Sequence, residues 1–265
     1  MTWLLFLSAL LLGAQAADLD IRDHYSPLDR ERPVQRHTRH IVLHTTEGGD
    51  ASAEREVHRR GLANYLVLRS GRVLRIIRKD REARHAGTSM WNGVENLDRI
   101  SIGIEVVGHH DRPITRRQER SIAELLRQLQ GIYGIADQDV LAHSMVAYGH
   151  PNRWHRRPHR GRKRCGMQFG QPELRSRLGL DYAPAYDPDL EAGRLADADP
   201  ELTAALYGRQ IGAGQTPAGV VGDAFRLPST VYVFPDGRRI RGHHIRDWGN
   251  IPAGTFVLLN QPGRG

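Results

Sequence analysis

The sequence of 265 residues lacks the features that define several large classes of protein. It holds one cysteine, so no disulfide can form within the chain and a disulfide-stapled scaffold is excluded. It has a single long apolar run, which excludes a protein with several membrane spans. The length and the 39% hydrophobic content instead predict a globular fold, either one large domain or one domain with a small additional module.

The chain is also poor in lysine, because only Lys79 and Lys163 stand among its 38 basic residues. Arginine supplies the rest, and the formal net charge is +8. This charge indicates an anionic partner without identifying it, since nucleic acid, a membrane surface and a cell-wall polymer all qualify. Residues 17–180 carry a net charge of +10 and residues 181–265 carry −2. The basic character therefore belongs to the first of these regions.

The N-terminus has the pattern of a secretory signal peptide. Residues 2–12 are uncharged and apolar, and the small residues Ala14 and Ala16 follow. This run is short for a stable membrane span and predicts cleavage after Ala16, so that residues 1–16 are removed. An N-terminal anchor or a buried strand is the alternative. We expect a periplasmic or secreted protein without an integral membrane span, in which a single unpaired cysteine is unusual and calls for a function.

Apolar periodicity predicts the elements of the main domain. Short β-branched runs predict buried strands over 40–44, 101–108 and 139–144, and a hairpin formed by 64–69 and 72–78. The helical spacing of the apolar residues over 115–133 begins with a capping-box pattern and ends at a glycine. The order strand, helix, hairpin, strand, helix, strand predicts an α/β fold with a central mixed β-sheet flanked by helices.

Composition divides the rest of the chain. Residues 181–201 hold seven acidic residues against one arginine, which predicts a linker, and a short helix is expected near 200–207. The predicted order is an N-terminal surface arm (17–37), the main domain (38–180), the acidic linker (181–201) and a small β-rich module of unknown role (202–265).

Three candidate metal ligands lie at or just beyond strand ends. His44 closes the first predicted strand, His143 closes the last, and Cys165 follows in a loop. Imidazole and thiolate bind zinc, and a catalytic zinc site has three protein ligands with the fourth position open. A thiolate bound to zinc would also account for the lone cysteine. By spacing alone, packed core histidines remain the more common interpretation, since the chain holds 14 histidines.

Six motifs in a fixed order support the interpretation of these residues as metal ligands. They are IVLHTTEG (41–48), ANYLVLRSGRV (63–73), RHAG (84–87), SIGIEVVG (101–108), LAHS (141–144) and RKRCG (162–166). This series resembles the zinc-dependent N-acetylmuramoyl-L-alanine amidases, a family that includes anhydro-muropeptide amidases, phage amidase lysozymes and animal peptidoglycan recognition proteins. The resemblance covers roughly residues 38–178 and implies a zinc site in a surface groove beside the mixed sheet.

The resemblance assigns roles residue by residue. His44, His143 and Cys165 match the three zinc ligands. Lys163 matches the lysine that stabilises the oxyanion, and Glu105 matches the general base of some branches. A carboxylate inside an apolar strand is costly unless it has a partner or a task, which agrees with the role of Glu105.

Further family positions concern the substrate. Asn64 and His85 match positions near the groove and are expected to contact substrate. Ala63 occupies the position at which phage members carry a catalytic tyrosine, which favours the branch that uses a glutamate. The reaction implied is hydrolysis of the amide between N-acetylmuramic acid and L-alanine, with one zinc ion as cofactor.

One departure from the family concerns the third ligand. His143 and Cys165 are 22 residues apart, much farther than in the family. An insertion around 149–161 accounts for the difference and leaves His155 and His159 open as substitutes. Cys165 is preferred because Lys163, two residues before it, and Gly166, directly after it, reproduce the family pattern.

The insertion continues into a basic segment and leaves rival functions open. Residues 153–164 hold seven cations and no acid, which indicates either a solvated loop or a lip that attracts anionic cell wall. We expect peptidoglycan or muropeptides as partners and a monomer. Nucleic acid is not expected, because no binding motif is present. A non-catalytic peptidoglycan-recognition protein is the alternative, disfavoured by the retained Cys165, Lys163 and Glu105.

Overall fold

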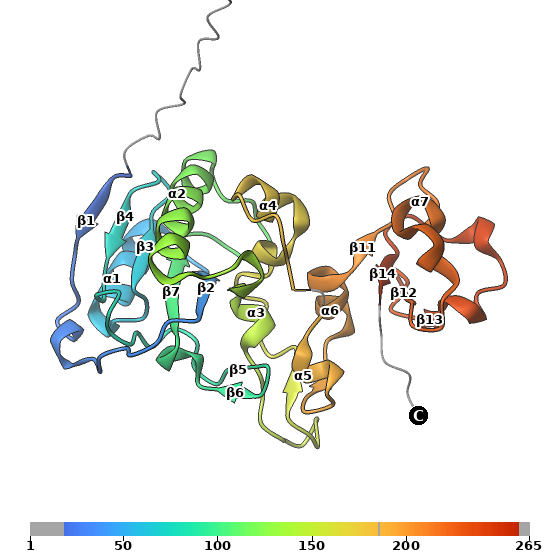
Figure 1. The fold of residues 1–265 in the computed structure, drawn as a ribbon, viewed down its shortest axis with the longest axis horizontal. Helices are drawn as coiled ribbons and strands as arrows, with labels where there is room; N and C mark the ends of the chain where they lie inside the picture. The colour runs from blue at the N-terminus through green and yellow to red at the C-terminus, as the bar shows by residue number, and fades with distance from the viewer. Residues whose placement is uncertain (1–18, 185, 260–265) are drawn as a thin grey trace, which may run out of the picture.

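The computed structural model describes residues 19–184 and 186–259, and a six-stranded mixed sheet forms the centre of the main domain (Figure 1). The predicted signal peptide, residues 1–16, lies outside the described residues. The strand order is β1 (Ile21–Asp23), β4 (Val73–Arg75), β3 (Tyr65–Val67), β7 (Ser101–Val106), β2 (His40–Thr45) and β8 (Val140–Ala142). Strands β3 and β4 are antiparallel, whereas the other neighbouring pairs are parallel. The predicted mixed α/β sheet is confirmed.

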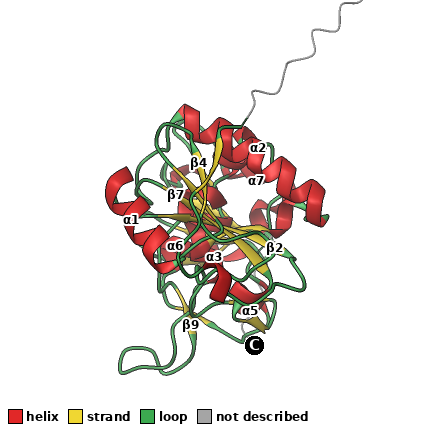
Figure 2. Ribbon diagram, turned by 90° about the vertical axis from the view of Figure 1, so that its left-hand side faces the viewer, coloured by secondary structure: helices red, strands yellow, loops and turns green. Residues whose placement is uncertain are grey.

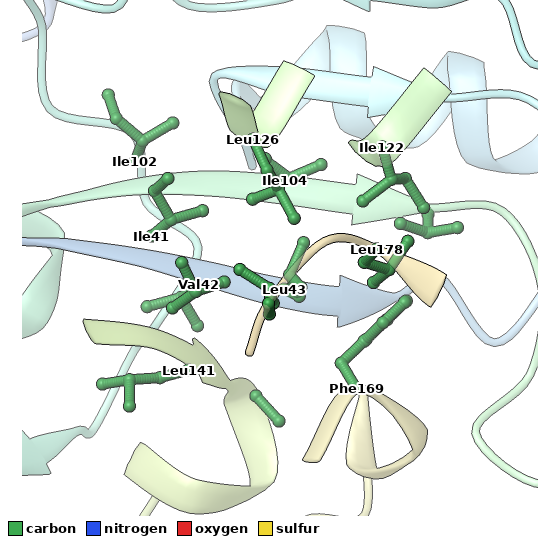
Figure 3. Packing of buried hydrophobic residues seen from close by; sticks show 14 of the residues in the cluster. Ile41, Val42, Leu43, Ile102, Ile104, Ile122, Leu126, Leu141, Phe169 and Leu178 are labelled. Atoms are coloured by element: carbon green, nitrogen blue, oxygen red, sulfur yellow. The ribbon is translucent and has the colours of Figure 1, made fainter. Parts of the chain in front are cut away.

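Helices cover both faces of this sheet. Tyr65 and Val67 of β3 pack with the cluster beneath α2 (Arg116–Tyr133), whereas the intervening Leu66 packs with α1 (Asp50–Arg60) on the other face, as the alternation of a strand requires. Figure 3 shows side chains of α2 above those of β7 and β2. Burial on both faces explains why the central strands are continuous apolar runs.

The parallel strands bring their carboxyl ends to one edge of the sheet. Strands β2 and β7 pair with His44 opposite Glu105. Strand β8 ends at Ala142, and the short helix α3 (His143–Val146) begins at the next residue. The prediction that a strand over 139–144 is closed by His143 is therefore wrong. This residue opens a helical turn, which leaves its side chain at the same edge.

The N-terminal arm is more than a surface segment. Strand β1 extends the sheet as a parallel edge strand beside β4. Farther along the arm, the carboxylate of Asp29 is buried and accepts hydrogen bonds from the backbone N–H and the Nε of Arg78, at 2.8 and 2.7 Å. The polar composition of residues 17–37 concealed this pairing, because an edge strand of three residues needs few apolar side chains.

The acidic segment 181–201 is folded against the basic insertion and is not a free linker. It forms α5 (Pro188–Glu191) and β10 (Ala196–Asp197), and β10 pairs with β9 (His159–Arg160). Arg160, Asp187 and Asp189 form a buried group that we call the arginine cluster. Its guanidinium donates to Asp187 at 2.5 Å and to Asp189 at 3.0 Å. Two of the acidic residues in this segment form buried salt bridges with Arg160. Composition alone could not distinguish such buried acids from acids exposed to solvent.

The C-terminal part contains a second, four-stranded antiparallel sheet. Its order is β11 (Arg209–Gln210), β14 (Phe256–Leu258), β12 (Val231–Val233) and β13 (Arg239–Arg241), with α7 (Pro217–Val221) packed beside it. The predicted short helix is α6 (Pro200–Tyr207). Its Leu202 and Leu206 join the main core, whereas Ala204 packs with the small sheet. Among the described residues, no helix has the length and apolar content to cross a membrane.

Candidate metal centre

Two histidines and the cysteine meet at the carboxyl edge of the main sheet. His44, His143 and Cys165 each offer a ligand atom, and these atoms lie within 4.8 Å of one another. The Sγ of Cys165 is 3.9 Å from Nδ1 of His44, and the two imidazole centroids are 4.3 Å apart. Both histidines are buried. The three residues that the sequence analysis named as candidate ligands, which span 122 positions, therefore lie in one group.

A buried hydrogen-bond chain orients His44. Its Nε2 lies 3.0 Å from Nδ1 of His85, and Nε2 of His85 lies 3.2 Å from Oγ of Ser101, which donates to the carbonyl of Leu97. Because the Ser101 hydroxyl donates to Leu97, it accepts from Nε2 of His85, and Nδ1 of His85 therefore accepts from Nε2 of His44. The proton of His44 is thus on Nε2, and its Nδ1 lone pair faces Cys165. A Cβ at Gly103 would lie 2.3 Å from the His85 ring, so glycine is required there.

His143 has the matching orientation. Its Nε2 donates to the carbonyl of Ala86 at 3.1 Å, and its Nδ1 is buried without a hydrogen-bond partner. Burial, together with the charge of Lys163, lowers the pKa of His143 to about 3, and burial beside His143, His85 and Lys163 lowers the pKa of His44 as well. Both imidazoles are therefore neutral, and each keeps a lone pair on Nδ1, the form that binds a metal.

The donor set fits zinc. Two neutral imidazole nitrogens and one sulfur are ligands that zinc prefers, and the unpartnered Nδ1 of His143 has no other assigned role in the structure. Burial raises the pKa of the Cys165 thiol to about 12, so the thiol would have to release its proton to solvent on binding a metal. His155 and His159, the substitutes considered from the sequence, stack on each other at 4.2 Å and are not part of this group.

Glu105 stands beside the three ligand residues. Its Oε1 is 3.8 Å from Nδ1 of His44, and its Oε2 is buried without a partner. Burial raises the pKa of this carboxyl to about 8, whereas the charge of Lys163 opposes the shift. Lys163 is exposed and lines the same groove. We call His44, His143, Cys165 and Glu105 the metal cluster.

The hydroxyl of Thr45, whose role the sequence analysis did not predict, holds the loop that carries Cys165. The hydroxyl of Thr45 accepts a hydrogen bond from the N–H of Gly166 at 2.9 Å and donates its own proton to Glu47 at 2.6 Å. The backbone N–H of Thr45 lies 3.4 Å from Sγ of Cys165. Gly166 has a φ of +69°, and a Cβ there would lie 2.4 Å from the carbonyl oxygen of Leu43. Thr45 and Gly166 are both inside the quoted motifs, which was the available signal.

The metal cluster lies in a groove of about 790 Å³ that also contains Glu47, Arg84 and Lys163. Of the two predicted substrate contacts, Asn64 is not among the lining residues. It is fully buried, and its side chain bonds the backbone of Arg78, Arg81 and Gly103. The prediction for Asn64 is therefore wrong, because its amide satisfies backbone groups between strands.

The other predicted contact, His85, borders the groove, but its side chain is buried and both of its ring nitrogens are engaged. It orients His44. A groove that combines two imidazoles, a thiol and a buried carboxyl group is characteristic of zinc hydrolases.

Comparison with known proteins agrees with this class. The family model described as N-acetylmuramoyl-L-alanine amidase matches residues 34–165. Residues 34–165, just under half of the chain, therefore belong to the N-acetylmuramoyl-L-alanine amidase family, amidase type 2. The matched segment contains each member of the metal cluster.

Curated relatives are similar over part of their length. The 1,6-anhydro-N-acetylmuramyl-L-alanine amidase AmpD of Enterobacter cloacae is 34% identical over 85 residues, which is 32% of this chain and 46% of that protein. The Escherichia coli AmpD is 31% identical over 90 residues, 34% of this chain and 49% of that protein. The chain thus spans about half the length of the curated relatives it matches.

Solved structures are also similar to the chain over part of its length. The amidase AmiD from E. coli, solved in complex with the substrate anhydro-N-acetylmuramic acid-L-Ala-D-gamma-Glu-L-Lys, is 21% identical with a TM-score of 0.45, over 72% of this chain and 80% of that one. AMPDH3 from Pseudomonas aeruginosa is 23% identical with a TM-score of 0.46, over 69% of this chain and 78% of that one.

Proposed function

We propose that this protein is a zinc-dependent amidase that cleaves the bond between N-acetylmuramic acid and L-alanine in peptidoglycan or muropeptides. The observation that carries the proposal is the group of His44, His143 and Cys165 at the floor of an open groove, with Glu105 beside it. The names of the curated relatives, which are anhydro-muramyl-L-alanine amidases, support this substrate class.

Each residue of the groove has a role in the proposed reaction. Nδ1 of His44, Nδ1 of His143 and Sγ of Cys165 would hold zinc, and bound zinc supplies a Lewis acid that polarises the scissile carbonyl and lowers the pKa of water. Glu105, once ionised, accepts the proton of the attacking water and returns it to the departing amine. The ammonium group of Lys163 stabilises the negative charge that develops on the carbonyl oxygen.

The proposed location is outside the cytoplasm. The apolar run and the small residues that end at Ala16 have the pattern of a cleaved signal peptide. A periplasmic or secreted enzyme would meet peptidoglycan directly. This part of the proposal is tested by the N-terminal sequence of the mature protein, which should begin at residue 17.

Digestion of purified sacculi tests the reaction. The zinc-loaded protein should release stem peptides with a free L-alanine amino terminus, identified by mass spectrometry, whereas Glu105→Gln should release almost none. A chelator should abolish release, and added zinc should restore it. Binding to sacculi without release would instead support a non-catalytic recognition protein.

A further inference from the structure

A loop of the basic insertion extends away from the groove. We call residues 150–158 the Trp154 loop. Its base is closed by Gly149 and His159, whose backbone groups exchange hydrogen bonds at 2.8 and 3.0 Å. Figure 2 shows a long loop projecting beneath β9. No residue of this loop is among those that line the groove, so its composition is not explained by substrate binding at the metal cluster.

The loop is internally braced. The side-chain oxygen of Asn152 accepts hydrogen bonds from the backbone N–H groups of Trp154 and His155, at 2.9 and 3.0 Å. The ring of His155 packs on that of His159 at 4.2 Å. The next residue, Arg160, is buried in the arginine cluster. The structure thus presents the tip of the loop on an anchored base.

The tip displays an aromatic ring among cations. Trp154 is 73% exposed, more than any other large hydrophobic residue in the described part of the chain. The guanidinium of Arg153 lies over its ring at 4.4 Å, and Arg156, two residues after Trp154, is exposed. Residues 149–164 contain no acidic side chain. An exposed tryptophan flanked by arginines combines an apolar surface with positive charge, the combination found in segments that bind membrane surfaces.

We propose that the Trp154 loop binds the surface of an anionic phospholipid bilayer. Tryptophan is enriched at the interface between lipid headgroups and acyl chains, where its apolar ring and its N–H are both satisfied. Arginines beside it pair with lipid phosphates, and each adds to the attraction of a negative surface. Because Arg153 covers one ring face, less of the ring is free to stack on a sugar. Binding is therefore peripheral, reversible and weakened by salt.

Co-sedimentation with vesicles tests the proposal on the purified chain. The protein should sediment with vesicles of phosphatidylcholine and phosphatidylglycerol at low salt, and not with pure phosphatidylcholine. Replacing two cations, Arg153→Gln with Arg156→Gln, should weaken binding roughly thirtyfold. The matched control, Arg55→Gln with Arg117→Gln, removes the same charge from exposed positions elsewhere and should weaken it far less.

The tryptophan has its own control. Trp154→Ala should weaken binding roughly tenfold, and Tyr182→Ala, which removes another highly exposed aromatic ring, should not. Three results would overturn the proposal: no sedimentation of the wild type with anionic vesicles, equal loss in the variants and their controls, or variants that bind vesicles normally and lose binding to sacculi. Hydrolysis of a soluble muropeptide should be the same in the loop variants, which separates failure here from failure of the amidase proposal.

Discussion

The metal cluster and the arginine cluster are both buried groups of ionisable side chains, yet they are built in opposite ways. In the arginine cluster, Arg160 donates to Asp187, to Asp189 and to the carbonyls of Val146 and Met90. In the metal cluster, two polar atoms are buried without any partner: Nδ1 of His143 and Oε2 of Glu105.

This difference separates a structural group from a reactive one. A buried charge whose hydrogen bonds are satisfied holds segments together, and here it joins the insertion to the acidic segment. A buried lone pair without a partner costs free energy, so its retention points to a ligand that the described chain does not itself provide. The two clusters should therefore respond differently to the same kind of substitution.

The largest contrast concerns Glu105. Glu105→Gln should lower kcat by about 10²–10⁴-fold, because the general base is lost. The substitution should leave the free energy of unfolding of the metal-free chain unchanged or higher, because a buried carboxyl without a partner is replaced by a neutral amide. Hydrolysis of a soluble muropeptide and urea unfolding measure the two effects. Retained activity would remove the general-base assignment.

Arg160 should behave in the reverse manner. Arg160→Leu should lower the free energy of unfolding by about 3–5 kcal/mol, because Asp187 and Asp189 are left buried without their main partner. Arg162→Gln, an exposed position two residues away, should change it by less than about 0.5 kcal/mol. Urea denaturation of both variants provides the comparison. Equal stability of the two variants would show that the arginine cluster is not a structural anchor.

Thr45 connects the metal cluster to its loop, and its effect should be intermediate. Thr45→Val preserves the shape but removes the acceptor of the Gly166 N–H, so zinc affinity should fall about 10–100-fold. Thr45→Ser keeps the hydroxyl and should bind zinc nearly as the wild type does. Competition with a chromophoric chelator measures both affinities. A normal affinity in the valine variant would mean that the cysteine loop is held by its packing on β2 alone.

The smallest predicted effect is a pH dependence of zinc binding. Cys165, with its pKa raised to about 12, is protonated at neutral pH and must release one proton to solvent when the metal binds, whereas His44 and His143 are already neutral. Zinc affinity should therefore rise about tenfold for each pH unit between about pH 5.5 and 6.5. The measurement belongs in a Glu105→Gln background, because Glu105, with a pKa of about 8, would release a second proton. Adding Cys165→Ser should flatten the dependence.

The sequence predicted the parts of the fold that repeat a pattern. Buried strands over 40–44 and 101–108 and the helix over 115–133 follow from apolar periodicity, and the position of His44 near the end of its strand follows from the first of them. The arm strand β1 and the folding of the acidic segment were missed, because both depend on partners far away in sequence. Periodicity within a segment carries no information about such pairing.

The roles within the site show a similar limit. Asn64 and His85 lie inside motifs, and position in a motif does not distinguish a side chain that meets substrate from one that holds a neighbour. The structure assigns Asn64 to backbone groups and His85 to His44. The hydroxyl of Thr45 was passed over because a threonine at a strand end has many ordinary roles.

The metal content of the purified chain tests the central claim most directly. Elemental analysis should find about one zinc per chain in the wild type and in Arg162→Gln, and none in Cys165→Ala, provided that circular dichroism shows each variant to be folded. Zinc retained by the Cys165→Ala variant at the wild-type level, or absent from the folded wild type after purification with zinc present, would contradict the account.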